Sequence, residues 1–227
     1  MDDLTSNWNR LTLSEKEGLG CCLDEELSSP EFSIVSKFLT KRALNIDAIA
    51  KIFIPLWRSK NGFRVRHLGD HRVLFMFDNK LEADRVLQSE SWSFDKHLVV
   101  MESYEANSSV DKLKLDRTSF WVQVHDLLIK FINVRAAEKI CEVLGKAIPT
   151  ANLRELKGGN FIQVRVSMNV TSPLCRGRLV SIGKEKQVWV SFKYERLLNI
   201  CYWCGSFDHD DKDCEIWLNS EGSLNQE

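Results

Sequence analysis

Residues 201–214 read Cys-Tyr-Trp-Cys-Gly-Ser-Phe-Asp-His-Asp-Asp-Lys-Asp-Cys, a spacing of C-x2-C-x4-H-x4-C. Three thiolates and one imidazole complete a tetrahedral shell around zinc. The two residues between the first cysteines let both sulfurs face one ion from a tight turn, and Gly205 supplies the backbone freedom to fold around it. The sequence therefore predicts one Zn²⁺ ion held by Cys201, Cys204, His209 and Cys214.

Four protein ligands leave no coordination position open for water, so we expect this site to be structural rather than catalytic. A segment this short cannot bury a core of its own, so metal binding and local folding should coincide. Two other readings stay open at this point. One is a chance cluster of reduced cysteines, and the other is a disulfide, which would leave one cysteine odd and His209 unexplained.

The same segment resembles the zinc knuckle of retroviral and retrotransposon nucleocapsid proteins. That resemblance implies that single-stranded nucleic acid stacks its bases on the knuckle aromatics, which here are Tyr202, Trp203 and Phe207. The sequence departs from the family pattern at Asp208, where glycine usually precedes the histidine. Because this knuckle carries four aspartates and one lysine, which disfavours phosphate, a role as a structural clip or protein-contact site also stays open.

Charge is distributed unevenly along the 227 residues. Residues 1–31 hold two basic and eight acidic side chains, and residues 205–227 hold one and seven, so each end has a net charge of -6. The remaining residues, 32–204, hold 28 basic and 17 acidic side chains, a net charge of +11. This basic segment, called here the basic body, indicates an anionic partner. The alternative is an ordinary solvated surface with acidic tails, which needs no charged partner.

Two groups of basic residues are candidates for phosphate contacts, although a solvated surface is the default reading for each one singly. One group alternates along an expected strand, and the other surrounds an expected turn. The candidates are Arg64, Arg66, Arg176, Arg178, Lys184 and Lys186.

The first folded unit is expected at residues 32–104, after an acidic and mostly disordered tail at 1–31. Apolar alternation predicts strands at 32–39, 63–68, 72–77 and 98–103. Helical spacing of apolar residues predicts helices after Asn45 and at 80–88, the second capped by Asp78 or Asn79. The order strand, helix, strand, strand, helix, strand is typical of ferredoxin-like folds, which RNA-recognition domains share. Phe75 and Phe77 are then either core residues or base-stacking residues.

Polar residues 105–118 are expected to form a linker to a second mixed α and β unit at residues 119–200. Strands are predicted at 120–125, 161–168, 178–182 and 188–194. Asn133 should cap a helix that ends at Gly145, and Gly158-Gly159 should form a turn. The knuckle at 201–214 and an acidic tail at 215–227 complete an α+β chain.

A wider resemblance joins these parts. Blocks such as Trp92-Ser93-Phe94-Asp95, Trp121-Val122-Gln123-Val124-His125 and Phe192-Lys193-Tyr194-Glu195-Arg196 precede the knuckle in order. Together they resemble a large plant family of retrotransposon-derived proteins, similar to the first open reading frame product of LINE-type elements. The resemblance covers roughly residues 32–214. It implies an RNA-recognition-like first domain, binding of nucleic acid and packaging of element RNA.

The sequence contains no recognisable nucleophile motif or phosphate-binding loop, so we expect a non-enzymatic protein. No apolar stretch approaches the roughly 20 residues that span a bilayer, and no secretory signal opens the chain, so we expect no membrane contact and a nuclear or cytoplasmic location. The expected partner is single-stranded nucleic acid, with RNA favoured. The alternative is a protein-interaction module that uses the acidic knuckle, with self-association or another protein as partner.

Overall fold

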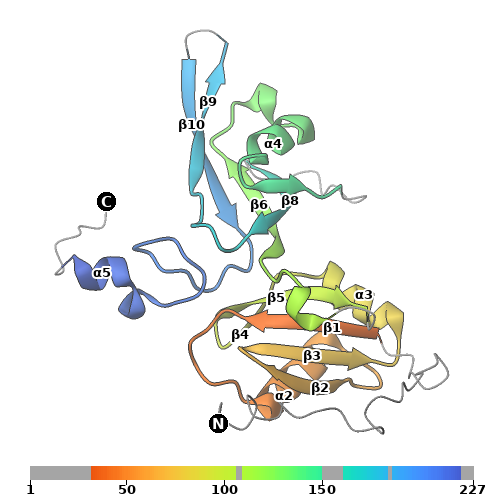
Figure 1. The fold of residues 1–227 in the computed structure, drawn as a ribbon. Helices are drawn as coiled ribbons and strands as arrows, with labels where there is room; N and C mark the ends of the chain where they lie inside the picture. Colours follow the sequence, from red (N-terminus) through yellow and green to blue (C-terminus); the bar gives the residue numbers. More distant parts are fainter. Residues whose placement is uncertain (1–31, 106–108, 150–160, 184–185, 221–227) are drawn as a thin grey trace, which may run out of the picture. The chain divides into compact units, whose positions relative to one another are not determined.

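The computed structural model describes residues 32–105, 109–149, 161–183 and 186–220 (Figure 1). They form a mixed α and β structure with two five-stranded antiparallel sheets and few helices. None of the helices in these ranges has the length and apolar character needed to cross a bilayer. The turn expected at Gly158-Gly159, the N-terminal tail and Lys184 lie outside the described residues.

The first sheet has the strand order β2-β3-β1-β5-β4. Its strands are β1 (Phe32–Phe38), β2 (Arg64–Gly69), β3 (Arg72–Phe77), β4 (Trp92–Phe94) and β5 (His97–Tyr104). Helix α2 (Ile46–Trp57) connects β1 to β2, and α3 (Lys80–Gln88) connects β3 to β4. The four longer strands and both helices coincide closely with the sequence predictions. The three-residue strand β4 was not predicted.

The helix boundaries follow from local backbone chemistry. The Asn45 side chain accepts a hydrogen bond from the backbone N–H of Ala48 at 3.0 Å, and Asn79 likewise accepts from Leu81 at 2.9 Å. Asparagine at the N-cap satisfies a backbone donor that has no partner within the helix. Asn79, rather than Asp78, is therefore the cap of α3. Helix α2 ends at Trp57, two residues after Pro55, and the next residue, Arg58, has a left-handed backbone conformation.

One face of the first sheet packs against α2 and α3 through an aromatic core. Trp57 and Phe75 meet edge to face at 4.9 Å between ring centroids, and Phe53 stacks on Trp57 at 4.5 Å. Phe75 and Phe77 are both fully buried in this cluster. The pair is therefore core, and the alternative reading of these rings as base-stacking residues is wrong.

The opposite face of this sheet, here called the outer face, buries Val35, Leu74 and Val100 in a second apolar cluster. Leu115, from the expected linker, is also buried there, and a 3-10 helix at Val110–Lys112 precedes it. The described part of the linker is thus packed, because its apolar residues cover sheet surface that would otherwise be exposed.

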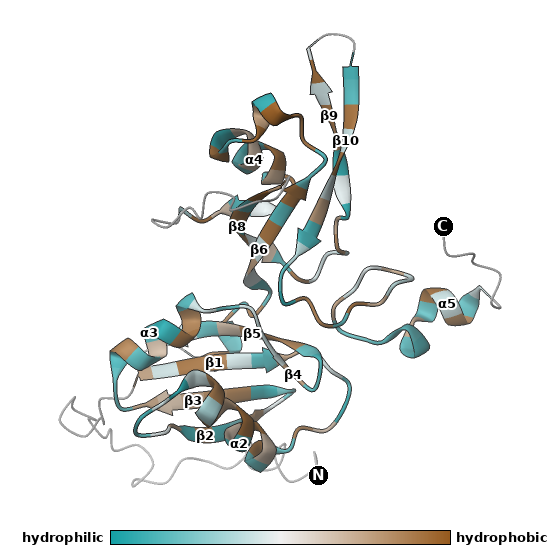
Figure 2. Cartoon of the chain, turned by 180° about the vertical axis from the view of Figure 1, so that it is seen from behind, coloured by the Kyte–Doolittle hydropathy of each residue, from teal (hydrophilic) through white to brown (hydrophobic). Residues whose placement is uncertain are grey.

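The second sheet has the strand order β7-β8-β6-β10-β9. Its strands are β6 (Arg117–His125), β7 (Gly145–Ala147), β8 (Ile162–Asn169), β9 (Gly177–Ile182) and β10 (Lys186–Tyr194). Helix α4 (Val134–Cys141) packs on one face of this sheet (Figure 1). Along β6 and β10 hydropathy alternates, so that one face of each strand is apolar and the other carries most of the polar side chains together with Trp121 and Trp189 (Figure 2).

Gly145 differs from its expected role. Helix α4 ends at Cys141, and Gly145 instead begins the unpredicted strand β7. A Cβ atom at this position would lie 2.1 Å from the carbonyl oxygen of Ser167. Glycine is required here by the close approach of two paired strands, not by a helix end.

Glu90, between α3 and β4, contacts the second sheet. Its carboxylate accepts a hydrogen bond from the backbone N–H of Ser119 at 3.3 Å and lies near Arg165. Desolvation by burial outweighs these favourable contacts and raises the pKa of Glu90 to about 7.

This raised pKa predicts a defined pH dependence of folding. Below the ordinary pKa of 4.5, Glu90 is protonated in both the folded and the unfolded protein. Between 4.5 and about 7 only the folded protein holds this proton, so the free energy of unfolding falls as the pH rises through this range. Glu90→Gln should therefore raise the free energy of unfolding at pH 8 by roughly 1–2 kcal/mol and leave it nearly unchanged at pH 4. Urea unfolding at both pH values measures this difference. The exposed Glu142→Gln variant is the control, and an equal response of the two variants would contradict the prediction.

Candidate metal centre

The four predicted ligands come together at the C-terminal end of the described chain. One potential ligand atom from each of Cys201, Cys204, His209 and Cys214 lies within 4.8 Å of the other three. A zinc ion with bonds of about 2.0–2.3 Å requires ligand atoms roughly 3.5–3.8 Å apart, so small side-chain adjustments close this set around one ion. The donor set and its spacing fit a structural zinc site.

The backbone between the first two cysteines folds into a tight turn. Gly205 N–H donates to the carbonyl of Cys201 at 2.8 Å, and Cys201 N–H donates to the carbonyl of Ser206 at 2.9 Å. Gly205 has a φ of +76°, in the left-handed region. Glycine adopts this conformation without strain, so the turn that aims both sulfurs at one point depends on it.

Asp208 orients the histidine ligand. The His209 Nδ1 atom lies 2.8 Å from Asp208 Oδ1, and the Nε2 atom lies 3.3 Å from the Cys204 sulfur. A carboxylate bonded to one ring nitrogen fixes the ring and makes the other nitrogen a better metal ligand. The aspartate that replaces the expected glycine therefore supports the metal centre.

The thiols differ in their readiness to ionise. Burial raises the pKa of Cys201 to about 12, so zinc must displace a proton from this sulfur. For Cys214, burial also acts against the charged form. Backbone N–H groups of Trp217 and Ile216 and the side chain of His209 overcome it and lower the pKa to about 7. Those N–H groups belong to the short helix α5 (Glu215–Asn219), which begins directly after the last ligand.

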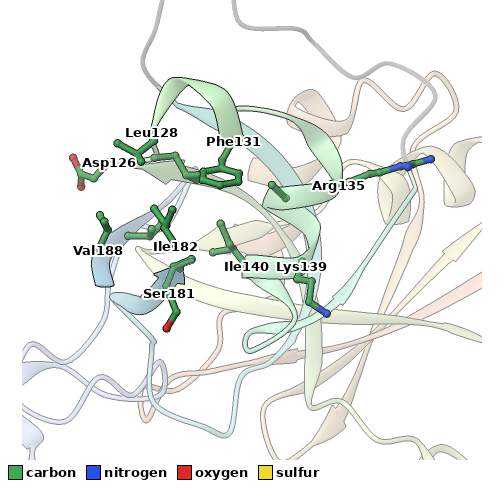
Figure 3. Close-up of a pocket in the computed structure, with 13 residues that line it drawn as sticks. Asp126, Leu128, Phe131, Arg135, Lys139, Ile140, Ser181, Ile182 and Val188 are labelled. Carbon is green, nitrogen blue, oxygen red and sulfur yellow. The ribbon is translucent and has the colours of Figure 1, made fainter. Parts of the chain in front are cut away.

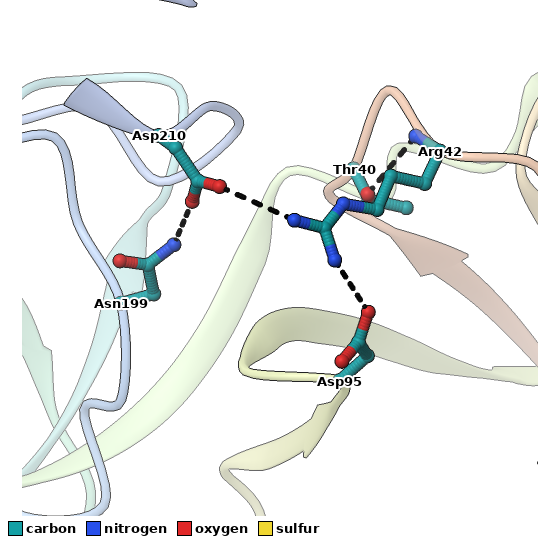
Figure 4. Close-up of polar contacts among 5 residues, drawn as sticks. All are labelled: Thr40, Arg42, Asp95, Asn199 and Asp210. Atoms are coloured by element: carbon teal, nitrogen blue, oxygen red, sulfur yellow. Dashed lines mark hydrogen bonds and ion pairs between the residues drawn. The ribbon is translucent and has the colours of Figure 1, made fainter. Parts of the chain in front are cut away.

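Other aspartates of the knuckle serve internal contacts. Asp211 accepts a hydrogen bond from the backbone N–H of Tyr202 at 2.6 Å, and Asp210 accepts one from the Asn199 side chain. Asp210 also lies 3.6 Å from the guanidinium of Arg42, which pairs with Asp95 at 2.8 Å (Figure 4). Asp210 and Asp211 therefore have a structural role within the knuckle, and their negative charges remain there.

The predicted stacking aromatics have three different environments. Phe207 is 3% exposed and stacks on Phe120 of the second sheet, with ring centroids 6.2 Å apart. Its predicted role in base stacking does not fit this position, because the ring is part of the core. Trp203 stacks on Trp217 at 4.0 Å, so one of its faces is covered, whereas Tyr202 is 74% exposed.

The predicted phosphate-binding residues also lie in different environments. Arg64 and Arg66 are exposed on the outer face of the first sheet, in register with Met76 and Leu74. Arg176 and Lys186 are exposed beside β9 and β10.

Arg178 instead donates to the carbonyl of Ile140 at 3.1 Å, near the C-terminal end of α4. A cation at this end satisfies a free helix carbonyl and opposes the negative end of the helix dipole. Its predicted phosphate contact does not fit this structural position.

Sequence reasoning missed Asp208 and Trp217 as parts of the centre. The adjacency of Asp208 to the histidine was visible, but its effect depends on ring orientation, which sequence does not reveal. Trp217 lies beyond the last ligand, where an acidic tail was expected.

Replacement of Asp208 tests the orienting contact. Asp208→Ala should weaken zinc affinity by roughly 10- to 100-fold, because the ring of His209 loses its partner. Competition with a chelating dye, in reduced protein, measures the dissociation constant. Asp213→Ala removes an exposed aspartate of the same segment and should change affinity little. Equal affinities for both variants would refute the role assigned to Asp208.

Comparisons with known proteins agree with this geometry. Residues 168–216 match the family model described as a zinc knuckle, which includes the four ligands. Residues 28–112 match a second family, described as a domain of unknown function (DUF4283). This pair of domains is the pattern of plant retrotransposon-like proteins.

One curated relative is the uncharacterized protein At4g02000 of Arabidopsis thaliana, 25% identical over 131 residues. The matched region covers 57% of this chain and 41% of that protein, so this chain spans about two fifths of its relative. No solved structure matches the chain. The chain thus carries a CCHC zinc knuckle behind a DUF4283 domain.

Proposed function

We propose that this chain is a zinc-dependent, non-enzymatic protein that binds single-stranded nucleic acid, with RNA favoured, in the nucleus or cytoplasm. The observation that carries the proposal is the assembled Cys201, Cys204, His209 and Cys214 set within a matched zinc knuckle. Zinc would hold the knuckle in its folded form, and the basic body would supply most of the attraction to phosphate. A retroelement origin accords with the domain pair and is part of this proposal.

The outer face of the first sheet supports the electrostatic part. By strand register, Lys37, Arg64, Arg66 and Arg72 all project from this face, away from α2 and α3. Basic side chains repeated across neighbouring strands can contact successive phosphates, and each such contact increases the salt dependence of binding. Arg72 also lies 3.2 Å from Asp111.

We infer a ferredoxin-like fold for the first unit. The order β2-β3-β1-β5, with antiparallel neighbours and one helix in each crossover, supports this reading. In an RNA-recognition domain the sheet face stacks bases on aromatics. Here the corresponding face buries Val35, Leu74 and Val100, so this domain would contribute charge rather than base stacking.

A second candidate function is protein interaction. A pocket of about 390 Å³ lies between α4 and the β9–β10 hairpin, lined by apolar side chains that include Leu128, Phe131, Ile140 and Ile182 (Figure 3). An apolar pocket of this size accommodates a side chain of a partner protein. This observation favours an interaction module that needs no nucleic acid.

A salt series tests the proposed function. Zinc-loaded protein should bind single-stranded RNA in a filter assay, and log Kd should rise linearly with log salt concentration. Removal of zinc by a chelator should weaken binding and leave the contribution of the basic body. Absence of binding at low salt by folded, zinc-loaded protein would end the proposal.

Charge reversal separates the two candidate functions. Arg64→Glu with Arg66→Glu should weaken RNA binding and reduce the salt slope by about two. Lys139→Glu, an exposed position on α4, is the matched control. Under the second candidate, Arg64→Glu with Arg66→Glu would retain partner capture, because neither arginine lines the apolar pocket, and the wild-type protein would show no RNA binding.

A further inference from the structure

Exposed aromatic rings are scarce in the described part of the chain. There, the aromatic side chains with more than about a third of their surface exposed are Phe32 at 37%, Trp189 at 51% and Tyr202 at 74%. Phe32 opens the first strand, and Tyr202 belongs to the knuckle. Trp189 instead stands in the middle of β10, on the face of the second sheet that is opposite α4.

This face, here called the open face, can be assigned from strand register. The side chains of two residues paired across neighbouring strands project from the same face of the sheet. The pairs Trp189–Leu179, Lys193–Gln123 and Gln123–Gln163 therefore place all of these side chains on the open face. Buried residues of the same strands, including Val190 and Phe192, point to the α4 side. Leu179 is 59% exposed, so an apolar and aromatic patch is presented to solvent.

Gly177 determines how the Trp189 ring lies. A Cβ atom at Gly177 would approach the indole Cζ2 and Cε2 atoms to 2.7 and 2.8 Å. The indole therefore lies across the bare backbone of β9 and leaves ring surface exposed. A planar ring held against a sheet is the arrangement on which a base can stack.

Trp121 also projects from the open face, and several of its other side chains are polar and held by hydrogen bonds. His125 stacks on Phe161 with centroids 4.8 Å apart, and its Nε2 lies 3.0 Å from Gln123 Oε1. Gln123 and Gln163 both donate to the Glu195 carboxylate. Hydrogen bonds thus fix these side chains next to the aromatic patch before any ligand arrives, which reduces the ordering cost of binding.

The charge of the open face favours an anionic ligand. By register, its basic side chains are Arg117, Lys146, Arg165 and Lys193. Two acidic side chains share this face. Glu195 accepts hydrogen bonds from the two glutamines. Asp126, directly after β6, accepts a hydrogen bond from Ser191 at 2.7 Å. Glu90 lies beside Arg165 at the other end of β6. Lys193 is exposed and adjacent to the stacked His125.

We propose that the open face of the second sheet is the base-stacking surface of this protein, with Trp189 as the stacking ring and Lys193 as a phosphate contact. The inference rests on the proposed function and names the site at which it acts. Single-stranded nucleic acid fits because its bases are accessible to the ring while its phosphates reach the lysine. The outer face of the first sheet lacks an exposed aromatic among its described residues, and the knuckle offers Tyr202 as its exposed ring.

Ring removal tests the site. Trp189→Ala should weaken binding of single-stranded oligouridylate by roughly 5- to 150-fold, the range expected for loss of one stacked base. Trp189→Phe keeps a ring and should retain most of the affinity. The matched control is Tyr202→Ala, which removes the exposed ring of the knuckle and should have the smaller effect. Circular dichroism and zinc content check that each variant is folded.

A charge variant provides an independent measurement. Lys193→Glu should weaken binding and lower the salt slope by at least one, whereas Lys139→Glu on the α4 side should not.

If the wild-type protein binds RNA but Trp189→Ala and Lys193→Glu bind equally well, the site is wrong and the proposed function stands. A larger loss in Tyr202→Ala than in Trp189→Ala would move the stacking surface to the knuckle. No binding by the wild-type protein removes the proposed function itself. A face that serves a partner protein would leave RNA affinity unchanged in all variants.

Discussion

The fold of the C-terminal part of this molecule depends on three sulfurs and one ring nitrogen that come together around one point. Fourteen residues cannot exclude enough water to fold alone, so their free energy of folding must come from metal coordination and from contacts with the body. Phe207 provides an apolar contact with the body, because its ring lies in the same buried cluster as Phe120. The knuckle is therefore joined to the second sheet through its core as well as through the chain.

Local sequence patterns were sufficient for much of the structure. Asparagine caps at Asn45 and Asn133, apolar stripes and strand alternation predicted the longer elements, because these signals act over a few neighbouring residues. The four ligands were predicted for the same reason, since their spacing in the chain nearly determines their spacing in space.

Features that depend on distant partners could not be read in this way. Phe207 and Tyr202 look alike as knuckle aromatics, yet one is core and the other exposed, and the difference arises from Phe120. Gly145 resembled a helix end until its contact with Ser167 was known. Trp189 carried no motif at all, and only the strand register shows which face it shares with Lys193.

Metal content is the most direct test of this account. Elemental analysis of the purified, reduced full chain should find one equivalent of zinc, and His209→Ala should reduce it substantially and loosen the fold of the knuckle. Far less than one equivalent in the wild-type protein, with no change on replacement of the histidine, would contradict the account.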